Sequence, residues 1–158
     1  MEESSPPNQV RFIDDYLLYL LARASHQIST EFHQHLRRRG ITVPVWRVLG
    51  SLLGSPGETV TSLAEVCLLQ QPTMTKLLDR MVRDGLVTRT QDLRDRRVVR
   101  VALTGRGEAI ANELAIAAKR HEAEVIARHA DAEATAIKAV LRAILDRQGK
   151  PRRGPAAP

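Results

Sequence analysis

The sequence predicts a mainly α-helical domain of the α+β class, in which one β-hairpin interrupts a series of helices. Apolar residues recur at helical spacing along most of the 158 residues. Only two runs, Leu86–Thr90 and Val98–Leu103, combine β-branched residues with the alternation of a strand. Aromatic residues make up 3% of the chain, so its core must consist mostly of Leu, Val, Ile and Ala. Such a composition favours helix.

The composition also limits the class of function. The formal net charge is +6 and the sequence pI is near 10.2, which suits a polyanionic partner such as nucleic acid. Cys67 is the one cysteine, so no disulfide can form within the chain. No apolar run reaches the roughly 18 residues of a membrane span, and the first nine residues do not resemble a signal peptide. We therefore expect a soluble cytoplasmic protein with no cofactor and no metal site.

The first long helix is expected from Val10 to Arg39, after a disordered leader at residues 1–9. Neither proline nor glycine interrupts this stretch, and Gly40 follows it as a C-cap. A shorter helix comes next, with Thr42 as its N-cap and Pro44 in its first turn. The residues expected on its buried stripe are Val45, Leu49, Leu52 and Leu53.

Two further short helices form the pattern of a helix-turn-helix. Thr59 or Thr61 can cap the first of them. The second begins near Gln71, has a proline in its first turn and ends at Gly85. The link 68–70 has three residues, the length that such a motif uses. The residues expected to face the core are Leu63, Ala64, Val66 and Cys67, then Met74, Leu77, Leu78 and Met81.

The two β-rich runs enclose the polar loop 91–97 and are expected to pair as a hairpin. Thr104 then caps a long alanine-rich helix, and Asp131 is expected to cap a last helix that ends near Asp146. Residues 147–158 are basic and are expected to form a disordered arm. The expected organisation is one domain at 10–146, with a winged helix at about 42–104 between helices at about 10–39 and 105–146.

This order of helices and hairpin is that of a winged helix-turn-helix with helical extensions at both ends. The sequence resembles the MarR family of bacterial transcription regulators over about residues 12–146, through the stretches 43–49, 63–87 and 92–104. Each stretch alone would be a weak indication, but their joint order and spacing are specific. The resemblance implies a homodimer that binds a palindromic operator in double-stranded DNA, most commonly as a repressor.

The second helix of the helix-turn-helix carries polar residues suited to DNA. A recognition helix enters the major groove with its N-terminal end first. Glutamine can pair with adenine, threonine can cover a thymine methyl, and the cations can reach phosphates or guanine. The predicted contacts are Gln70, Gln71, Thr73, Thr75, Lys76 and Arg80. The alternative is that Gln70, Gln71 and Thr73 only cap the helix.

The hairpin loop is rich in arginine, which suits the narrow minor groove. The resemblance implies that Arg94 enters the minor groove and that Arg96 contacts an adjacent phosphate. Asp95 and Arg97 are expected to pair within the hairpin and hold its shape, and Asp92 to brace Arg94. A solvated hairpin that touches no DNA is the alternative.

The first helix and the last two are expected to form the dimer surface, which the resemblance also implies. Small residues on the last two helices would let two helices approach closely; they are Ala115, Ala117, Ala118, Ala136 and Ala139. The alternative is that these helices only cover the core of the monomer.

Members of the family often respond to phenolic or aromatic carboxylate ligands, or to oxidants. Tyr19, Arg23 and His26 share one helical face, where the arginine and histidine could hold a carboxylate. With Trp46 stacked on the ring, and with Arg47, they make up the predicted effector site. The alternative places Trp46 in the core and leaves the arginines solvated or ion-paired.

Two other functions remain open alternatives. Cys67 could sense oxidants, although a cysteine buried among apolar residues is normally inert. An architectural DNA-binding protein without an effector would share the basic charge and the wing. No phosphate-binding loop, dinucleotide motif or nucleophile motif occurs, so we do not expect an enzyme.

Overall fold

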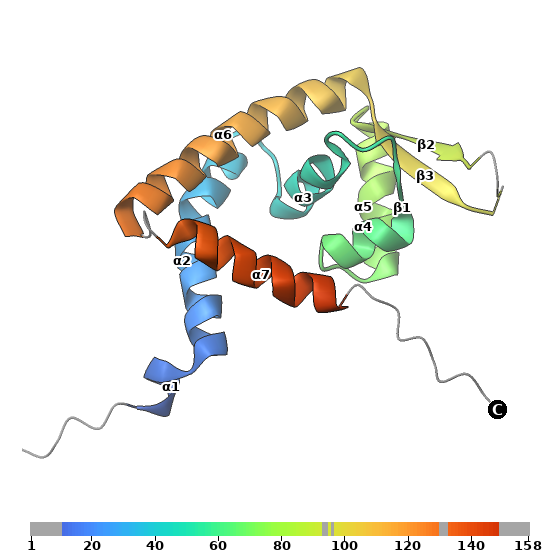
Figure 1. The fold of residues 1–158 in the computed structure, drawn as a ribbon. Helices are drawn as coiled ribbons and strands as arrows, with labels where there is room; N and C mark the ends of the chain where they lie inside the picture. Colours follow the sequence, from blue (N-terminus) through green and yellow to red (C-terminus); the bar gives the residue numbers. More distant parts are fainter. Residues whose placement is uncertain (1–10, 93–94, 96, 130–132, 149–158) are drawn as a thin grey trace, which may run out of the picture. The chain divides into compact units, whose positions relative to one another are not determined.

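The computed structural model describes residues 11–92, 95, 97–129 and 133–148. The chain divides into two compact units, residues 1–118 and 119–158. The first unit holds a three-stranded sheet and the helices around it (Figure 1). The predicted leader at residues 1–9, the predicted cap Asp131 and most of the predicted basic arm lie outside the described residues.

The predicted first helix is in fact two helices, α1 (Phe12–Asp15) and α2 (Leu17–Arg38). They meet at Tyr16, whose backbone is extended, with φ −78° and ψ 110°. Its carbonyl accepts the amides of Tyr19 and Leu20, so it starts α2 as an N-cap would. Its ring stacks on Phe12 with centroids 5.1 Å apart. The break therefore pairs two aromatic rings, which helical periodicity alone did not indicate.

The junction between α2 and α3 (Val43–Leu52) follows the sequence prediction. Gly40 has φ +68°, and the Ile41 amide donates to the Leu36 carbonyl at 3.0 Å, which closes the end of α2. Thr42 caps α3, since its Oγ1 accepts the Val45 amide at 3.5 Å. The two helices are thus joined by a short turn whose backbone groups are satisfied locally.

The helix-turn-helix consists of α4 (Val60–Val66) and α5 (Gln71–Arg83). Of the two candidate caps, Thr59 begins α4, because its Oγ1 accepts the Ser62 amide at 3.1 Å. Leu68 in the link has φ +58°, which a residue with a side chain rarely adopts. Val66 is 62% exposed and not part of the buried face, which corrects the prediction.

The sheet is antiparallel, with strand order β1-β3-β2. β2 (Val87–Gln91) pairs with β3 (Val99–Leu103) as the predicted hairpin, with Val87 opposite Leu103. β1 (Glu58–Thr59) lies on the other side of β3 and was not predicted. Two residues are too few to show the alternation by which a strand is found in a sequence.

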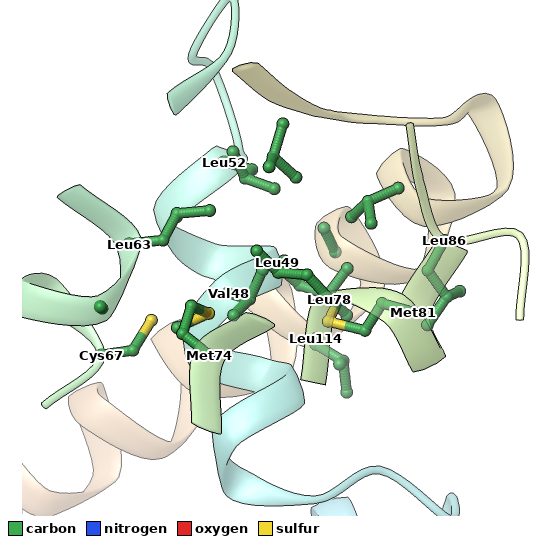
Figure 2. Packing of buried hydrophobic residues seen from close by; sticks show 14 of the residues in the cluster. Val48, Leu49, Leu52, Leu63, Cys67, Met74, Leu78, Met81, Leu86 and Leu114 are labelled. Carbon is green, nitrogen blue, oxygen red and sulfur yellow. The ribbon is translucent and has the colours of Figure 1, made fainter. Parts of the chain in front are cut away.

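One hydrophobic core unites these elements. Figure 2 shows Leu49 of α3 and Leu78 of α5 lying near Leu114 of α6 (Gly105–His129). All three are fully buried. The core also takes in Phe32 and Leu36 from the C-terminal half of α2. The sixteen buried hydrophobic residues of the described chain are mostly Leu, Val and Ala, as the composition predicted, with two methionines, one cysteine and one phenylalanine and no isoleucine.

The second unit holds the end of α6 and the whole of α7 (Ala134–Gln148). Lys138 of α7 donates to Glu122 of α6 at 2.9 Å, and Lys119 reaches the same carboxylate at 2.9 Å. None of the α7 residues with described side chains is buried. No helix in the described part of the chain combines the length and apolar character that a membrane span requires.

Candidate DNA-binding surface

The recognition helix α5 divides cleanly into a buried face and an exposed face. Met74, Leu78 and Met81 are fully buried in the core. The six DNA contacts predicted on or next to this helix are all exposed; they are Gln70, Gln71, Thr73, Thr75, Lys76 and Arg80. The core therefore holds the helix by one side and leaves its polar side open to a ligand.

Hydrogen bonds within this face order some of the side chains. Gln71 Nε2 donates to Thr61 Oγ1 of α4 at 2.9 Å, and Thr75 Oγ1 donates to the Gln71 carbonyl at 3.0 Å. Arg80 Nε lies 3.7 Å from a carboxylate oxygen of Asp84. The side chain of Gln70 makes no capping bond to the helix, so capping does not explain that glutamine.

The wing is held in shape by the aspartate–arginine pair that the sequence predicted. Arg97 donates its amide to Asp95 Oδ1 at 3.0 Å and its Nε to the same oxygen at 3.2 Å. These hydrogen bonds from the Arg97 side chain and backbone hold the pKa of Asp95 below its usual value. Arg94 and Arg96, the predicted DNA contacts of the wing, lie outside the described residues, and so does the predicted brace between Asp92 and Arg94.

A second ion pair closes the base of the wing. Asp92 Oδ2 accepts Arg100 Nε at 2.5 Å, and Arg100 Nη1 donates to the Gly57 carbonyl at 3.2 Å. Arg100 is therefore engaged within the fold, where it joins β3 to the segment that leads into β1.

Arg89 of β2 was not singled out from the sequence. Its Nη1 donates to Asp79 Oδ1 of α5 at 2.6 Å, and its Nη2 donates to the Thr75 carbonyl at 3.2 Å. The pair joins residues ten apart in the chain, on a helix and a strand. Nothing in the local pattern marks such a contact, because it depends on how the sheet packs on α5.

The comparisons with known proteins agree with this geometry. Residues 39–98 match the profile of the MarR family. The solved structure of a MarR family transcriptional regulator from Silicibacter pomeroyi DSS-3 is 44% identical, covers 87% of this chain and 98% of its own, and superposes with a TM-score of 0.78. The chain belongs to the MarR family. Its winged helix is therefore that of a family of transcription regulators, which are not enzymes.

Two other similar proteins carry a small aromatic acid in their names. The homoprotocatechuate degradative operon repressor of Escherichia coli is 33% identical over 98 residues, which are 62% of this chain and 66% of the repressor. This chain thus spans just under two thirds of that relative's length. A Mycobacterium tuberculosis MarR family protein solved in complex with salicylic acid is 27% identical, covers 83% of this chain and 97% of its own, and has a TM-score of 0.66.

The MarR chain described here has a cavity along α2 that takes in three of the predicted effector residues. Tyr19, Arg23 and His26 line it, and its volume is about 640 Å³. The Arg23 guanidinium lies 5.6 Å from the centre of the Tyr19 ring. The other lining residues are Ala22, Gln27, Thr30 and Glu31, so one helix supplies the whole described lining.

Trp46 and Arg47 are not among the described residues that line this cavity, so the structure brings three of the five predicted residues together there. Trp46 is half-buried and meets Phe32 edge to face, with ring centroids 5.6 Å apart. Arg47 Nη1 donates to the Cys67 carbonyl at 3.1 Å. Both side chains therefore help pack α3 against neighbouring parts of the first unit, Trp46 against Phe32 of α2 and Arg47 against Cys67 at the end of α4.

A smaller cavity of about 410 Å³ lies where α2 meets α3 and was not predicted. His33 and Arg37 line it, together with residues of the turn and the first turn of α3. Burial, and then the positive charges of Arg47 and Arg37, hold the pKa of His33 below its ordinary value. The histidine is therefore neutral over a wider pH range than a solvated one.

Cys67 is fully buried, at the end of α4. Its Sγ lies 4.0 Å from the Ser51 hydroxyl, and burial raises the pKa of the thiol. Low exposure and a low thiolate fraction both oppose reaction with oxidants.

Proposed function

We propose that this chain is a homodimeric DNA-binding repressor, which occupies a palindromic operator and is released by a small aromatic acid. The observation that carries the proposal is the exposed polar face of α5 beside the β2–β3 hairpin, with both packed on one hydrophobic core. In a twofold dimer, two such lobes would meet two half-sites about one DNA turn apart.

The proposed DNA contacts divide between the two grooves. Gln70, Gln71, Thr73 and Thr75 would read base edges in the major groove, with Lys76 and Arg80 on phosphates or guanine. Arg94 would enter the minor groove, and Arg96 would bind a phosphate beside it. The Asp95–Arg97 and Asp92–Arg100 pairs support this assignment, because they hold the hairpin in shape before DNA arrives.

Exposed apolar residues support the dimer. The large hydrophobic side chains exposed at the ends of the chain are Phe12, Tyr16, Leu17, Leu18, Leu20 and Leu21, then Ile137, Val140, Leu141, Ile144 and Leu145. Such patches commonly mark an interface. The small residues predicted to line the dimer surface differ in burial. Ala117 and Ala118 pack against the hydrophobic core, whereas Ala136 and Ala139 are exposed on α7.

Arg23 and His26 would hold the carboxylate of the effector, and Tyr19 would stack on its ring. The α2 cavity that these three line supports the assignment. The names of two relatives point to the same chemical class, since one was solved with salicylic acid and the other represses a homoprotocatechuate degradative operon.

The DNA-binding part is tested on a duplex that the wild-type protein selects from a random-sequence pool. Arg94→Ala is expected to weaken binding to this duplex strongly while leaving the thermal midpoint nearly unchanged. Each lost phosphate contact should also lower the salt dependence of binding by about one ion. Arg38→Ala, which removes an exposed arginine at the end of α2, is the matched control. An unchanged dissociation constant for Arg94→Ala would refute the wing assignment. Footprinting that shows no discrete palindrome would favour an architectural protein.

The effector part is tested by calorimetric titration with salicylate and homoprotocatechuate. Arg23→Gln and His26→Gln should abolish the heat of binding. Gln34→Ala, an exposed position on α2 outside the cavity, should retain it. Binding that survives both substitutions would place the effector elsewhere.

A further inference from the structure

Arg89 occupies a position where the sheet would ordinarily carry an apolar residue. Along β2, Val87, Arg89 and Gln91 share one face of the strand, and Val87 is buried in the core. Arg89 lies opposite Val101, which is fully buried in β3. Its side chain is only 29% exposed. The chain therefore places a cation at the side of the sheet that packs on α5.

The contacts of Arg89 cross from the wing to the recognition helix. The guanidinium reaches the Asp79 carboxylate and the Thr75 carbonyl, both on α5. Its Nε is buried and has no hydrogen-bond partner among the described residues. A cation that gives up this much hydration needs its carboxylate, because an unpaired charge at a half-buried site is costly.

The Arg89 contacts with Asp79 and Thr75 form a clamp between the wing hairpin and the helix that would meet DNA. α5 and β2 are joined through Gly85, whose backbone has φ +67°. The clamp holds α5 at Thr75 and Asp79, next to Lys76 on its exposed face. The angle between α5 and the hairpin fixes how far apart the major-groove and minor-groove contacts lie. A side chain that fixes this angle would control both sets of contacts together.

We infer that Arg89 is a positioning residue that acts through Asp79 to fix the recognition helix relative to the wing, so that both engage one operator half-site. This inference rests on the proposed function. It assigns Arg89 a role inside the protein and no contact with DNA. It also explains Asp79, whose negative charge on an exposed helix face would otherwise only repel phosphates.

The direction in which Asp79→Ala changes DNA affinity distinguishes this positioning role from a direct phosphate contact. Asp79→Ala removes a negative charge from the proposed DNA-binding helix, so electrostatics alone predicts tighter binding. Loss of positioning predicts weaker binding, on the order of tenfold for the selected duplex. Glu65→Ala removes an exposed acid from α4 and is the matched control for charge. Weaker binding of Asp79→Ala alone supports the inference, and equal or tighter binding overturns it.

Two further variants complete the test. Arg89→Lys keeps a point charge but cannot reach two acceptors in the same way. It should lose most of the operator affinity if Arg89 positions α5, and should keep that affinity if Arg89 binds a phosphate. Arg89→Gln combined with Asp79→Ala should bind no worse than the weaker single variant, because both remove the same contact.

Stability and function are separated by a second duplex of random sequence and by thermal melting. A purely structural role would lower the melting temperature and leave the ratio of operator to random-duplex affinity unchanged, which would overturn the inference. A fall in that ratio for protein that is still folded supports it. If the wild-type protein selects no duplex at all, the proposed function fails, and that result is distinct from any of these.

Discussion

Residues 32–114, here called the winged-helix lobe, bury their apolar side chains. The helical ends of the chain, which are α1 with the start of α2 and then α7, leave most of theirs exposed. Among the described residues, all sixteen buried hydrophobic residues lie between Phe32 and Leu114. α1 has no buried residue, and neither has the part of α7 whose side chains are described. These two helices and the start of α2 nevertheless carry many large apolar residues, and most of them are exposed.

This difference in burial indicates which part of the chain is stabilised by its own core. In the lobe, the helices and the sheet cover each other's apolar faces, so these faces need no further surface to bury them. At the ends, apolar side chains such as Leu145, which is 68% exposed, gain stability only when another surface covers them. The lobe therefore covers its own apolar residues, whereas the exposed apolar residues at the ends would be covered in the proposed dimer.

Replacing one leucine in each region should give the largest contrast. Leu78→Ala opens a cavity in the lobe core and should lower the free energy of unfolding by about 2–5 kcal/mol. Leu145→Ala should instead raise the dissociation constant of the proposed dimer by about tenfold. Chemical denaturation and sedimentation at several concentrations measure the two effects. The comparison breaks if Leu145→Ala leaves the dimer unchanged and destabilises the monomer.

A close backbone approach inside the lobe offers the next test. A Cβ added to Gly107 would lie 1.9 Å from the Leu86 carbonyl oxygen, whereas one added to Gly105 would meet nothing within 4 Å. Alanine normally favours a helix over glycine. Gly107→Ala should nevertheless cost about 1–3 kcal/mol, because backbone must move, and Gly105→Ala should be neutral or stabilising. Thermal melting of the two variants decides, and a stabilised Gly107→Ala would refute the close packing.

The fold was largely predictable because most of its signals are local. Gly40, Thr42 and Thr104 mark helix ends through chemistry that each residue performs with its near neighbours. The break at Tyr16 escaped the pattern, since no proline or glycine marks it and its ring contact is the visible gain. β1 also escaped, because a strand of two residues exists only through its partner β3.

The candidate site was predictable by face but not by contact. Helical spacing correctly separated the exposed residues of α5 from the buried Met74 and Leu78. It could not show that Arg47 turns towards Cys67, or that Arg89 reaches across to Asp79. Those contacts join residues that are far apart in sequence or lie on different elements, so they follow only from the tertiary packing.

The cysteine tests how tightly the lobe is closed. Cys67 is fully buried, so a reagent can reach its thiol only after the core opens. Burial also raises the pKa of the thiol. Alkylation of the folded protein at neutral pH should be about 100-fold slower or more than in denaturant. Mass spectrometry of samples quenched over time measures the rate. Reaction as fast as a free thiol would revive the oxidant-sensing alternative.

The smallest effect is expected in the second unit, where one carboxylate links two helices. Lys138 and then Lys119 donate hydrogen bonds that hold the pKa of Glu122 below its usual value. A lowered carboxyl pKa means that the folded state favours the charged form. Its contribution to stability is thus present at neutral pH and lost as the pH falls below about 4.5, through the lowered value. Because the pair is partly exposed, the contribution is about 0.5 kcal/mol at most.

Glu122→Gln should therefore lower the melting temperature by about 1–2 °C at pH 7 and have no effect near pH 3, where the wild-type carboxyl is also neutral. Glu124→Gln, which removes a more exposed acid from the same helix, is the control. The ion pairs of Glu122 with Lys138 and Lys119 lie outside the lobe. If the Glu122 variant loses as much stability as a core substitution, then α6 and α7 contribute more to the folded monomer than their exposed side chains indicate, and the division into a self-sufficient lobe and dependent ends is wrong.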